Sequence, residues 1–337
     1  MKIGLLGSKG TTLDFLAGFE AETGHQITHL ITLAEGKASS KVSFYAADAL
    51  KSAAEGRITH EARSYTLTAE EDRAFFSNAG LDVLFVLGWE RLLPVDVLKM
   101  VRCGAYGMHG SPFGLPLGRG RSPMNWAILQ GHVQFVTSLF RYSDGIDDGD
   151  IVGSKVFTIS PRDDIGTLHL KNRLAMLKLA GLHLADILDG TAVHTVQPAL
   201  TPTFYPKRTA EDGAIGWSAS TQEIDRLVRA VAPPYPGAFT FLDGARLVIE
   251  TARPFEAAFF PSTVPAGTIL DVSPSMEAFV VKTGDGSLFV TRFSGAKISE
   301  IRRGDVLRSD AVKWTSELLS ERYGPGQAPD AWEVRPS

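Results

Sequence analysis

Short apolar runs alternate with segments of helical spacing through the first half of the chain. Residues 2–6 form such a run, which ends at Gly7, and residues 11–19 then repeat apolar side chains along one helical face. The run indicates a buried strand, and the spacing indicates a helix that packs against it. When strands and helices alternate in this way, the helices cover both faces of a mostly parallel sheet. The alternation therefore predicts an α/β domain with a Rossmann-like, doubly wound sheet.

The same signals place further elements in this domain. We expect strands at residues 2–6, 27–32, 83–87, 104–109, 136–141 and 152–159. We expect helices at residues 11–19, 69–79, 94–101, 122–130 and 165–188. The sequence GSKGTT at residues 7–12 fits either a tight turn or a phosphate cradle at the N-terminus of the first helix.

A second domain follows a stretch without periodicity. Pro198, Pro202 and Pro206 accumulate between about residues 190 and 217, which indicates a linker. A helix expected at 221–232 precedes short strands, expected at 238–241, 247–251, 268–272, 278–283 and 288–293. Gly, Pro and Asp turns separate these strands, which favours a small open β-barrel. We predict domains at 1–190 and 216–310, a linker at 191–215, and a C-terminal helix and tail at 311–337.

Composition excludes several classes of protein. The formal net charge of −4 lacks the basic excess that binding to a phosphate backbone needs, so nucleic acid is not expected as a partner. Cys103 is the only cysteine, which excludes an internal disulfide and a C-x-x-C metal site, and we expect no metal. The first residues lack the features of a signal peptide, and no apolar run reaches the roughly 18 residues of a membrane span. We therefore expect a cytoplasmic protein without membrane contact.

A histidine followed by a glycine-rich loop stands at the end of a predicted strand. His109 ends the strand expected at 104–109, and open α/β sheets bind ligands at such strand ends. Asp147 lies in an acidic loop between two later strands, which a parallel or mixed sheet returns to the same edge. Taken singly, His109 fits a structural residue and Asp147 a turn residue. The combination indicates acid–base chemistry, in which the carboxylate orients and polarises the imidazole.

Together these segments resemble the formyltransferase family that uses N10-formyltetrahydrofolate. The family signature is a strand ending in N-x-H, then S-x-L-P-x-x-R-G-x-x-P and W-A-I, then D-x-G-x-I. The matching residues are His109, Ser111, Pro116, Arg119, Gly120, Pro123, Trp126, Ala127, Ile128, Asp147, Gly149 and Ile151. The resemblance extends to GWERLLP at residues 88–94 and to residues 206–212 and 233–239, so it covers nearly the whole chain.

The resemblance implies roles for these residues. His109 would assist loss of the amine proton and stabilise the tetrahedral intermediate, and Asp147 would hold and charge the histidine. The co-substrate would be N10-formyltetrahydrofolate, bound by Gly88, Trp89, Arg91, Leu92, Asp144, Gly145 and Ile146. The acceptor would be bound by Ser111, Arg119, Gly120, Arg121 and Pro123. Two alternatives stay open: both arginines also fit solvated loop charges, and Trp89 fits either stacking on the pterin or packing.

One position departs from the family pattern. The asparagine two residues before the histidine is Gly107 here. Side chains alternate along a strand, so residue 107 shares a face with His109, and its glycine removes an oxyanion donor. We expect a space beside Gly107, filled by an ordered water that supplies the donor together with a protonated His109.

The acceptor must be chosen among those of the related enzymes. These formylate initiator methionyl-tRNA, glycinamide ribonucleotide or nucleotide-linked amino sugars, and one relative hydrolyses formyl-folate. From residue 206 onward the chain has 15 basic and 17 acidic residues, which offers no footprint for tRNA. GWERLLP, GRGRSP and FYPKR are most similar to sugar N-formyltransferases of surface-polysaccharide pathways, so we predict a nucleotide-linked amino sugar. The alternatives are a methionyl-tRNA formyltransferase and a folate-binding protein with catalysis weakened by Gly107; a homodimer is compatible with the sequence.

Overall fold

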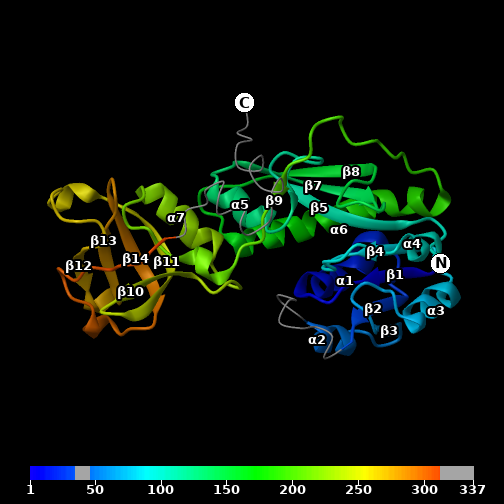
Figure 1. Cartoon of the computed structure of the whole chain (residues 1–337), viewed down its shortest axis with the longest axis horizontal. Helices are drawn as coiled ribbons and strands as arrows, with labels where there is room; N and C mark the ends of the chain where they lie inside the picture. The colour runs from blue at the N-terminus through cyan, green and yellow to red at the C-terminus, as the bar shows by residue number, and fades with distance from the viewer. Residues whose placement is uncertain (35–45, 312–337) are drawn as a thin grey trace. The chain divides into compact units, whose positions relative to one another are not determined.

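The structure is a computed structural model that describes residues 1–34 and 46–311 (Figure 1). The chain divides into two compact units that are not continuous in sequence. The first unit comprises residues 1–120, 134–157 and 170–203, and the second comprises 121–133, 158–169 and the residues from 204 onward. The boundaries predicted near residues 190 and 215 stay a prediction. The predicted C-terminal helix and tail lie outside the described residues except for Ala311.

The first unit is built on a seven-stranded sheet with the order β3-β2-β1-β4-β5-β7-β8. Its strands are β1 (Ile3–Leu6), β2 (His29–Leu33), β3 (Ile58–Ala62), β4 (Val83–Val86), β5 (Ala105–Ser111), β7 (Gln134–Arg141) and β8 (Ile151–Thr158). Strands β1 to β5 run parallel, whereas β5 and β7 pair antiparallel. The strand order reverses between β1 and β4, the point where open α/β sheets form a ligand crevice.

Helices cover both faces of this sheet, as the sequence predicts. They are α1 (Gly10–Thr23), α2 (Ala47–Ser52), α3 (Glu70–Ala79), α4 (Val95–Lys99) and α6 (Ile165–Asp189). On one face, Phe15 of α1 and Leu184 of α6 share a buried cluster with Phe85 of the sheet. On the other face, Phe76 of α3 packs in a separate cluster with Val97 of α4. The Rossmann-like fold is thereby confirmed, with one antiparallel strand pair added to the parallel sheet.

The second unit contains a five-stranded antiparallel sheet with the order β10-β11-β14-β13-β12. Its strands are β10 (Ala238–Leu242), β11 (Ala245–Phe255), β12 (Ile269–Ser273), β13 (Ala278–Lys282) and β14 (Ser287–Ser294). Phe241 of β10 exchanges two backbone hydrogen bonds with Arg308, and the Ile269 amide of β12 donates to the Asp305 carbonyl oxygen. The segment 305–308 therefore hydrogen-bonds to both outer strands and curls the sheet toward a barrel. The predicted C-terminal β domain is confirmed.

Short elements complete the described chain. The helices α5 (Pro123–Leu129) and α7 (Thr221–Ala230) belong to the second unit. Two-residue strands and 3-10 helices are β6 (Arg119–Gly120), β9 (Phe204–Tyr205), η1 (Ala210–Gly213), η2 (Ala257–Phe259), η3 (Pro274–Met276) and η4 (Ile298–Glu300). No helix in the described ranges combines the length and apolar character that a membrane crossing needs.

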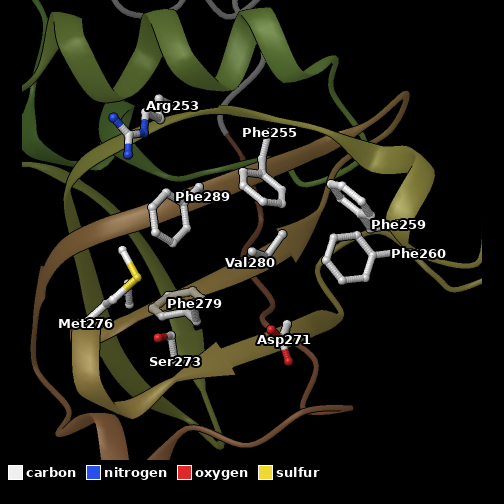
Figure 2. A pocket seen from close by; sticks show the side chains of 11 residues that line it. Arg253, Phe255, Phe259, Phe260, Asp271, Ser273, Met276, Phe279, Val280 and Phe289 are labelled. Atoms are coloured by element: carbon white, nitrogen blue, oxygen red, sulfur yellow. The ribbon is translucent and has the colours of Figure 1, made fainter.

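A hollow of about 750 Å³ opens in the second unit (Figure 2). Phenylalanines of β11, β13 and β14 surround it, with Arg253 and Asp271 as charged groups in its lining. None of the residues that line it belongs to the motifs around His109 and Asp147. The size of this hollow therefore does not identify the site of chemistry, which we locate from the motif residues instead.

Candidate active site

His109 and Asp147 lie side by side although 37 residues separate them in sequence. His109 stands near the carboxyl end of β5, and Asp147 lies in the loop between β7 and β8 with φ of 50°. The imidazole Nδ1 is 3.4 Å from the carboxylate Oδ2, and both side chains are largely buried. The structure thus brings together the pair that the sequence predicts, because β5 and β7 are neighbours.

The second ring nitrogen of His109 also faces an oxygen. Its Nε2 lies 2.8 Å from the carbonyl oxygen of Gly118 in the glycine-rich loop. A carbonyl oxygen only accepts, so this contact requires a proton on Nε2. The ring is therefore oriented by the Gly118 carbonyl on one side and faces the Asp147 carboxylate on the other.

Ser111 shapes the glycine-rich loop. Its buried hydroxyl donates to the Leu117 carbonyl oxygen at 2.7 Å and accepts from the Gly114 amide at 2.9 Å. These bonds fold the loop back on the end of β5 and so fix the position of Gly118 against His109. The contacts of Ser111 are those of a loop-shaping residue, and acceptor binding by Ser111 stays a prediction.

Arg119 is buried beside the acidic loop. Only 8% of the residue is exposed, and its Nη2 donates to Oε1 of Gln197 at 2.8 Å. Burial lowers the pKa of Arg119, whereas the charges of Asp148 and Asp147 raise it. A guanidinium stays protonated under such shifts, so Arg119 supplies a positive charge near the carboxylate of Asp147. Its burial rules out the alternative of a solvated loop charge.

Gln197 is a site residue that sequence reasoning missed. Its Nε2 donates to the carbonyl oxygens of Asp147 and Gly149, at 2.8 Å each, while its Oε1 accepts from Arg119. One side chain therefore ties Arg119 to the backbone of the acidic loop. No signal marked Gln197, because it lies in the stretch without periodicity that we interpret as a linker.

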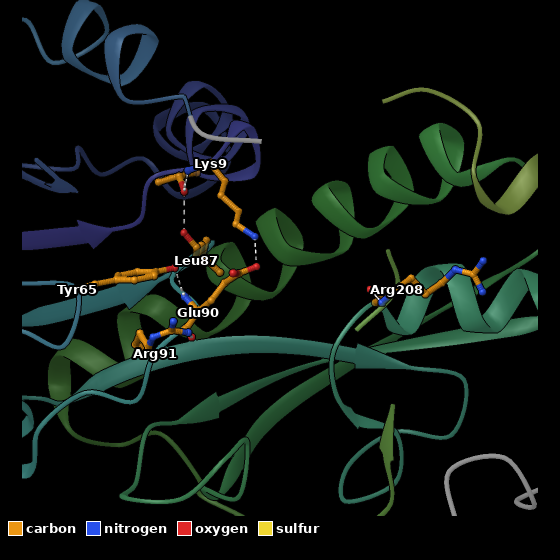
Figure 3. Close-up of polar contacts among 8 residues, drawn as sticks. Lys9, Tyr65, Leu87, Glu90, Arg91 and Arg208 are labelled. Atoms are coloured by element: carbon orange, nitrogen blue, oxygen red, sulfur yellow. Dashed lines mark hydrogen bonds and ion pairs between the residues drawn. The ribbon is translucent and has the colours of Figure 1, made fainter. Parts of the chain in front are cut away.

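The GWERLLP segment follows β4, at the point where the strand order reverses (Figure 3). Lys9 forms an ion pair with Glu90, and the Glu90 amide donates to the Tyr65 hydroxyl at 3.1 Å. The Arg91 guanidinium lies 4.9 Å from the centre of the Tyr65 ring. Trp89 is 6% exposed and packs edge-on against Tyr65, and its indole N–H has no hydrogen-bond partner among the described residues.

The other residues predicted to bind the folate differ in their exposure. Gly88 has φ of 74°, a conformation that favours glycine, and Leu92 is 48% exposed. In the acidic loop, Asp144 and Ile146 are exposed and Gly145 is partly exposed. Exposed apolar side chains such as Leu92 and Ile146 offer surface to a ligand, and binding by these residues stays a prediction.

The glycine turn after β1 packs tightly against the end of β4. A Cβ on Gly7 would lie 1.9 Å from the Leu87 carbonyl oxygen, to which the Thr12 hydroxyl donates at 2.7 Å. Lys9, the cation of this turn, is paired with Glu90. These contacts favour the tight turn over the phosphate cradle.

The remaining predicted acceptor residues fall on both sides of the sequence position at which the first unit ends. Gly120 has φ of 94°, whereas Arg121 and Pro123 belong to the second unit. The Arg121 amide donates to the Tyr205 carbonyl oxygen at 2.8 Å, and Pro123 opens α5. Trp126 of α5 is fully buried and donates to the Pro206 carbonyl oxygen. Trp126 is thus packed as a core residue.

The space expected beside Gly107 is filled by protein. A Cβ on Gly107 would lie 2.4 Å from Cε2 of Tyr142 and 3.0 Å from Cζ of Phe140. The antiparallel register places Phe140 directly opposite Gly107, and Tyr142, one residue beyond the end of β7, follows on the same face. The prediction of an ordered water in this space is therefore wrong, because an aromatic ring occupies it.

Comparison with known protein families identifies the chain. Residues 21–183 match the family model described as formyl transferase. Residues 207–307 match the model described as formyl transferase, C-terminal domain. The chain belongs to the formyl transferase family. In this formyl transferase, the range that matches the first family model contains His109 and Asp147. The range that matches the second contains the antiparallel sheet.

Solved structures share the fold. HypX from Aquifex aeolicus in complex with tetrahydrofolic acid has a TM-score of 0.62 and 20% identity, over 88% of this chain and 44% of that chain. An N-formyltransferase from Helicobacter canadensis in complex with folinic acid and dTDP-3-aminofucose has a TM-score of 0.58 and 15% identity, over 87% and 100% of the two chains. Methionyl-tRNA formyltransferase from Clostridium thermocellum has a TM-score of 0.51 and 16% identity, over 75% and 92%. The chain spans less than half the length of the HypX chain, and such identities show the fold alone.

The described residues contain no group of three or more His, Cys, Asp or Glu side chains that could hold a metal ion.

Proposed function

We propose that this formyl transferase moves a formyl group from N10-formyltetrahydrofolate to the amine of a nucleotide-linked amino sugar. The observation that carries the proposal is the contact between His109 and Asp147 at the carboxyl end of β5, within the motif of the family. The folate and folinic acid bound by the HypX and Helicobacter canadensis proteins support the choice of donor.

The residues of the pair suit each part of formyl transfer. The amine nitrogen attacks the formyl carbon, and the electron pair of the C=O bond moves to the oxygen. The amine then loses a proton, the bond from carbon to N10 breaks, and N10 takes up a proton. A protonated His109 stabilises the oxyanion, and Asp147 stabilises that protonated ring. The imidazole relays a proton between the amine and N10 as the intermediate collapses.

The balance of charge favours a sugar nucleotide over tRNA as the acceptor. With 15 basic and 17 acidic residues from residue 206 onward, the C-terminal part offers little attraction to a long polyanion. The Helicobacter canadensis protein, which shares this fold, binds dTDP-3-aminofucose in its complex, and this supports a sugar nucleotide as the acceptor here. Methionyl-tRNA formylation is the alternative, supported by the likeness to the Clostridium thermocellum enzyme. A cytoplasmic location, a place in polysaccharide biosynthesis and a homodimer remain proposals.

Product formation with a panel of acceptors tests the proposal. The purified protein would be mixed with 10-formyltetrahydrofolate and, in turn, dTDP- and UDP-linked amino sugars or initiator methionyl-tRNA, and products would be identified by mass spectrometry. We expect an N-formyl sugar nucleotide. Formylation of the tRNA alone would move that alternative to first place. Binding of 5-formyltetrahydrofolate without transfer to any acceptor would instead favour a folate-binding protein.

A further inference from the structure

We propose that Tyr142 is a catalytic residue whose hydroxyl donates a hydrogen bond to the formyl oxygen as that oxygen becomes anionic. The inference rests on the proposed function, since it assigns a donor for the same reaction. It replaces the ordered water, for which the structure leaves no room beside Gly107.

Tyr142 lies on the side of the sheet that carries His109. Its amide donates to the Ala105 carbonyl oxygen at 2.8 Å, which continues the pairing of β7 with β5 for one residue beyond β7. Ala105, Gly107 and His109 alternate onto one face of β5. The edge of the Tyr142 ring rests on Gly107, two residues before His109. Only a glycine at position 107 leaves this place to the ring.

The Tyr142 ring is held rigidly by its neighbours. It stacks on Phe140 with ring centres 5.4 Å apart and an angle of 30° between the planes. It also packs against the buried cluster that contains Trp89 and Leu93 of the GWERLLP segment. The ring therefore contacts Gly107 on the strand of His109 and packs against the cluster that includes part of the GWERLLP segment. A donor fixed in this way needs no rearrangement when charge develops on the substrate.

The hydroxyl of Tyr142 suits a hydrogen-bond donor. It makes no hydrogen bond to another group among residues 1–34 and 46–311, so its proton is not committed elsewhere. Burial raises the pKa of Tyr142, and the negative charge of Asp147 raises it further. The phenol accordingly stays protonated throughout the neutral pH range, as a donor to an oxyanion must.

In the reaction, this hydroxyl donates without giving up its proton. The amine nitrogen forms a bond to the formyl carbon, and the displaced π electron pair resides on the oxygen, where the Tyr142 O–H and protonated His109 stabilise it. The amine then loses its proton, the pair returns to carbon as the bond to N10 breaks, and N10 takes up a proton relayed by the His109 imidazole. Tyr142 is thus unchanged after each turnover, and no oxidant or further reactant is required.

The substitution Tyr142→Phe tests the proposal because it removes the hydroxyl and keeps the ring. Rates would be measured with 10-formyltetrahydrofolate and dTDP-3-aminofucose as probes. We expect kcat to fall about a hundred- to a thousandfold, as it does on loss of one oxyanion donor. The KM for the folate and the midpoint of thermal unfolding should stay near the wild-type values. The matched control is Tyr106→Phe, since Tyr106 packs on the opposite face of β5 and its hydroxyl donates to the Cys103 carbonyl oxygen.

A second pair of variants separates chemistry from packing. Gly107→Asn alone should lose activity, because its side chain collides with the Tyr142 ring. In the Tyr142→Ala background the ring is gone, and Gly107→Asn should raise kcat at least about tenfold by restoring a donor on the same face.

The kcat of the wild-type enzyme tests the proposed function, whereas the ratio of kcat in wild type to kcat in Tyr142→Phe tests the role of Tyr142. Failure of the proposed function and failure of the role of Tyr142 can therefore be told apart. Equal kcat for wild type and Tyr142→Phe would overturn the role of Tyr142. A loss confined to KM or to thermal stability would overturn it as well.

Discussion

The side-chain amide of Gln197 donates to the carbonyl oxygen of Asp147 at 2.8 Å. Asp147 holds a backbone conformation with φ of 50°, which is unfavourable for a residue other than glycine. The same amide nitrogen donates to Gly149, and its oxygen accepts from buried Arg119. Gln197 therefore stabilises the loop that presents the Asp147 carboxylate to His109, although it does not touch the imidazole itself.

We expect Gln197→Leu to lower kcat about ten- to a hundredfold, since small displacements of a reacting group cost this much. Gln197→Glu should be impaired as well, because a carboxylate accepts from Arg119 but cannot donate to the two carbonyl groups. Steady-state kinetics would show the loss in kcat, with binding of 5-formyltetrahydrofolate retained in calorimetry. Gln26→Leu is the control, as Gln26 is exposed and bonds to Glu20. Wild-type kcat in both Gln197 variants would contradict a positioning role.

A methyl group at position 107 should destabilise the fold. Gly107→Ala places its Cβ 2.4 Å from the Tyr142 ring, so the ring or the strand must shift. We expect a loss of about 1–3 kcal/mol in the free energy of unfolding, the usual cost of overpacking. The control is Gly10→Ala in α1, where a Cβ meets nothing within 4 Å. Urea unfolding of both variants checks this, and a Gly107→Ala protein as stable as Gly10→Ala would show that the site has room.

The free energy of unfolding should decrease on acidification, because the buried His29 has a lowered pKa. Burial lowers the pKa of His29 below its ordinary 6.5, and the charge of Lys2 lowers it further. The folded state therefore binds fewer protons than the unfolded state between the two pKa values, and the free energy of unfolding decreases as the pH drops below about 6.5. His29→Gln should flatten this dependence in urea titrations at pH 7.5 and 5.5, relative to a His25→Gln control. An unchanged slope in the His29 variant would contradict the linkage.

Initiator tRNA should bind only weakly. With its slight acidic excess, the C-terminal part forms few phosphate contacts, and those it forms are lost as salt is added. Electrophoretic mobility shifts at about 50 and about 200 mM salt, roughly the range over which such contacts weaken, would measure this. Tight binding that persists at the higher concentration would support the tRNA alternative.

Sequence patterns predict this fold well where the strands are buried on both sides. The fully buried runs of β1, β2 and β4 leave little choice, whereas β3 was missed because it is an edge strand whose His60 and Glu61 break the pattern. The short helix α2 was also missed, as one and a half turns carry little periodicity.

The pair of His109 and Asp147 follows from the motif, but its surroundings do not. Tyr142 meets Gly107 only through the antiparallel register of β5 and β7, which the sequence leaves open. Gln197 reaches Asp147 from a segment without periodicity, through bonds made by a single side chain. Both contacts depend on how distant segments pack, and no local pattern encodes that.

Turnover in variants of the central pair tests the account most directly. His109→Ala and Asp147→Asn should each lower kcat at least about a hundredfold, because general acid–base groups contribute this much. The double variant should be little worse than the more damaged single variant, since the two residues act as one unit. The measurement is kcat for formyl transfer from 10-formyltetrahydrofolate to dTDP-3-aminofucose by wild type, both single variants and the double variant. Our account predicts active wild type and strongly non-additive losses; near-wild-type kcat in either single variant, or a double loss equal to the product of the two, would contradict it.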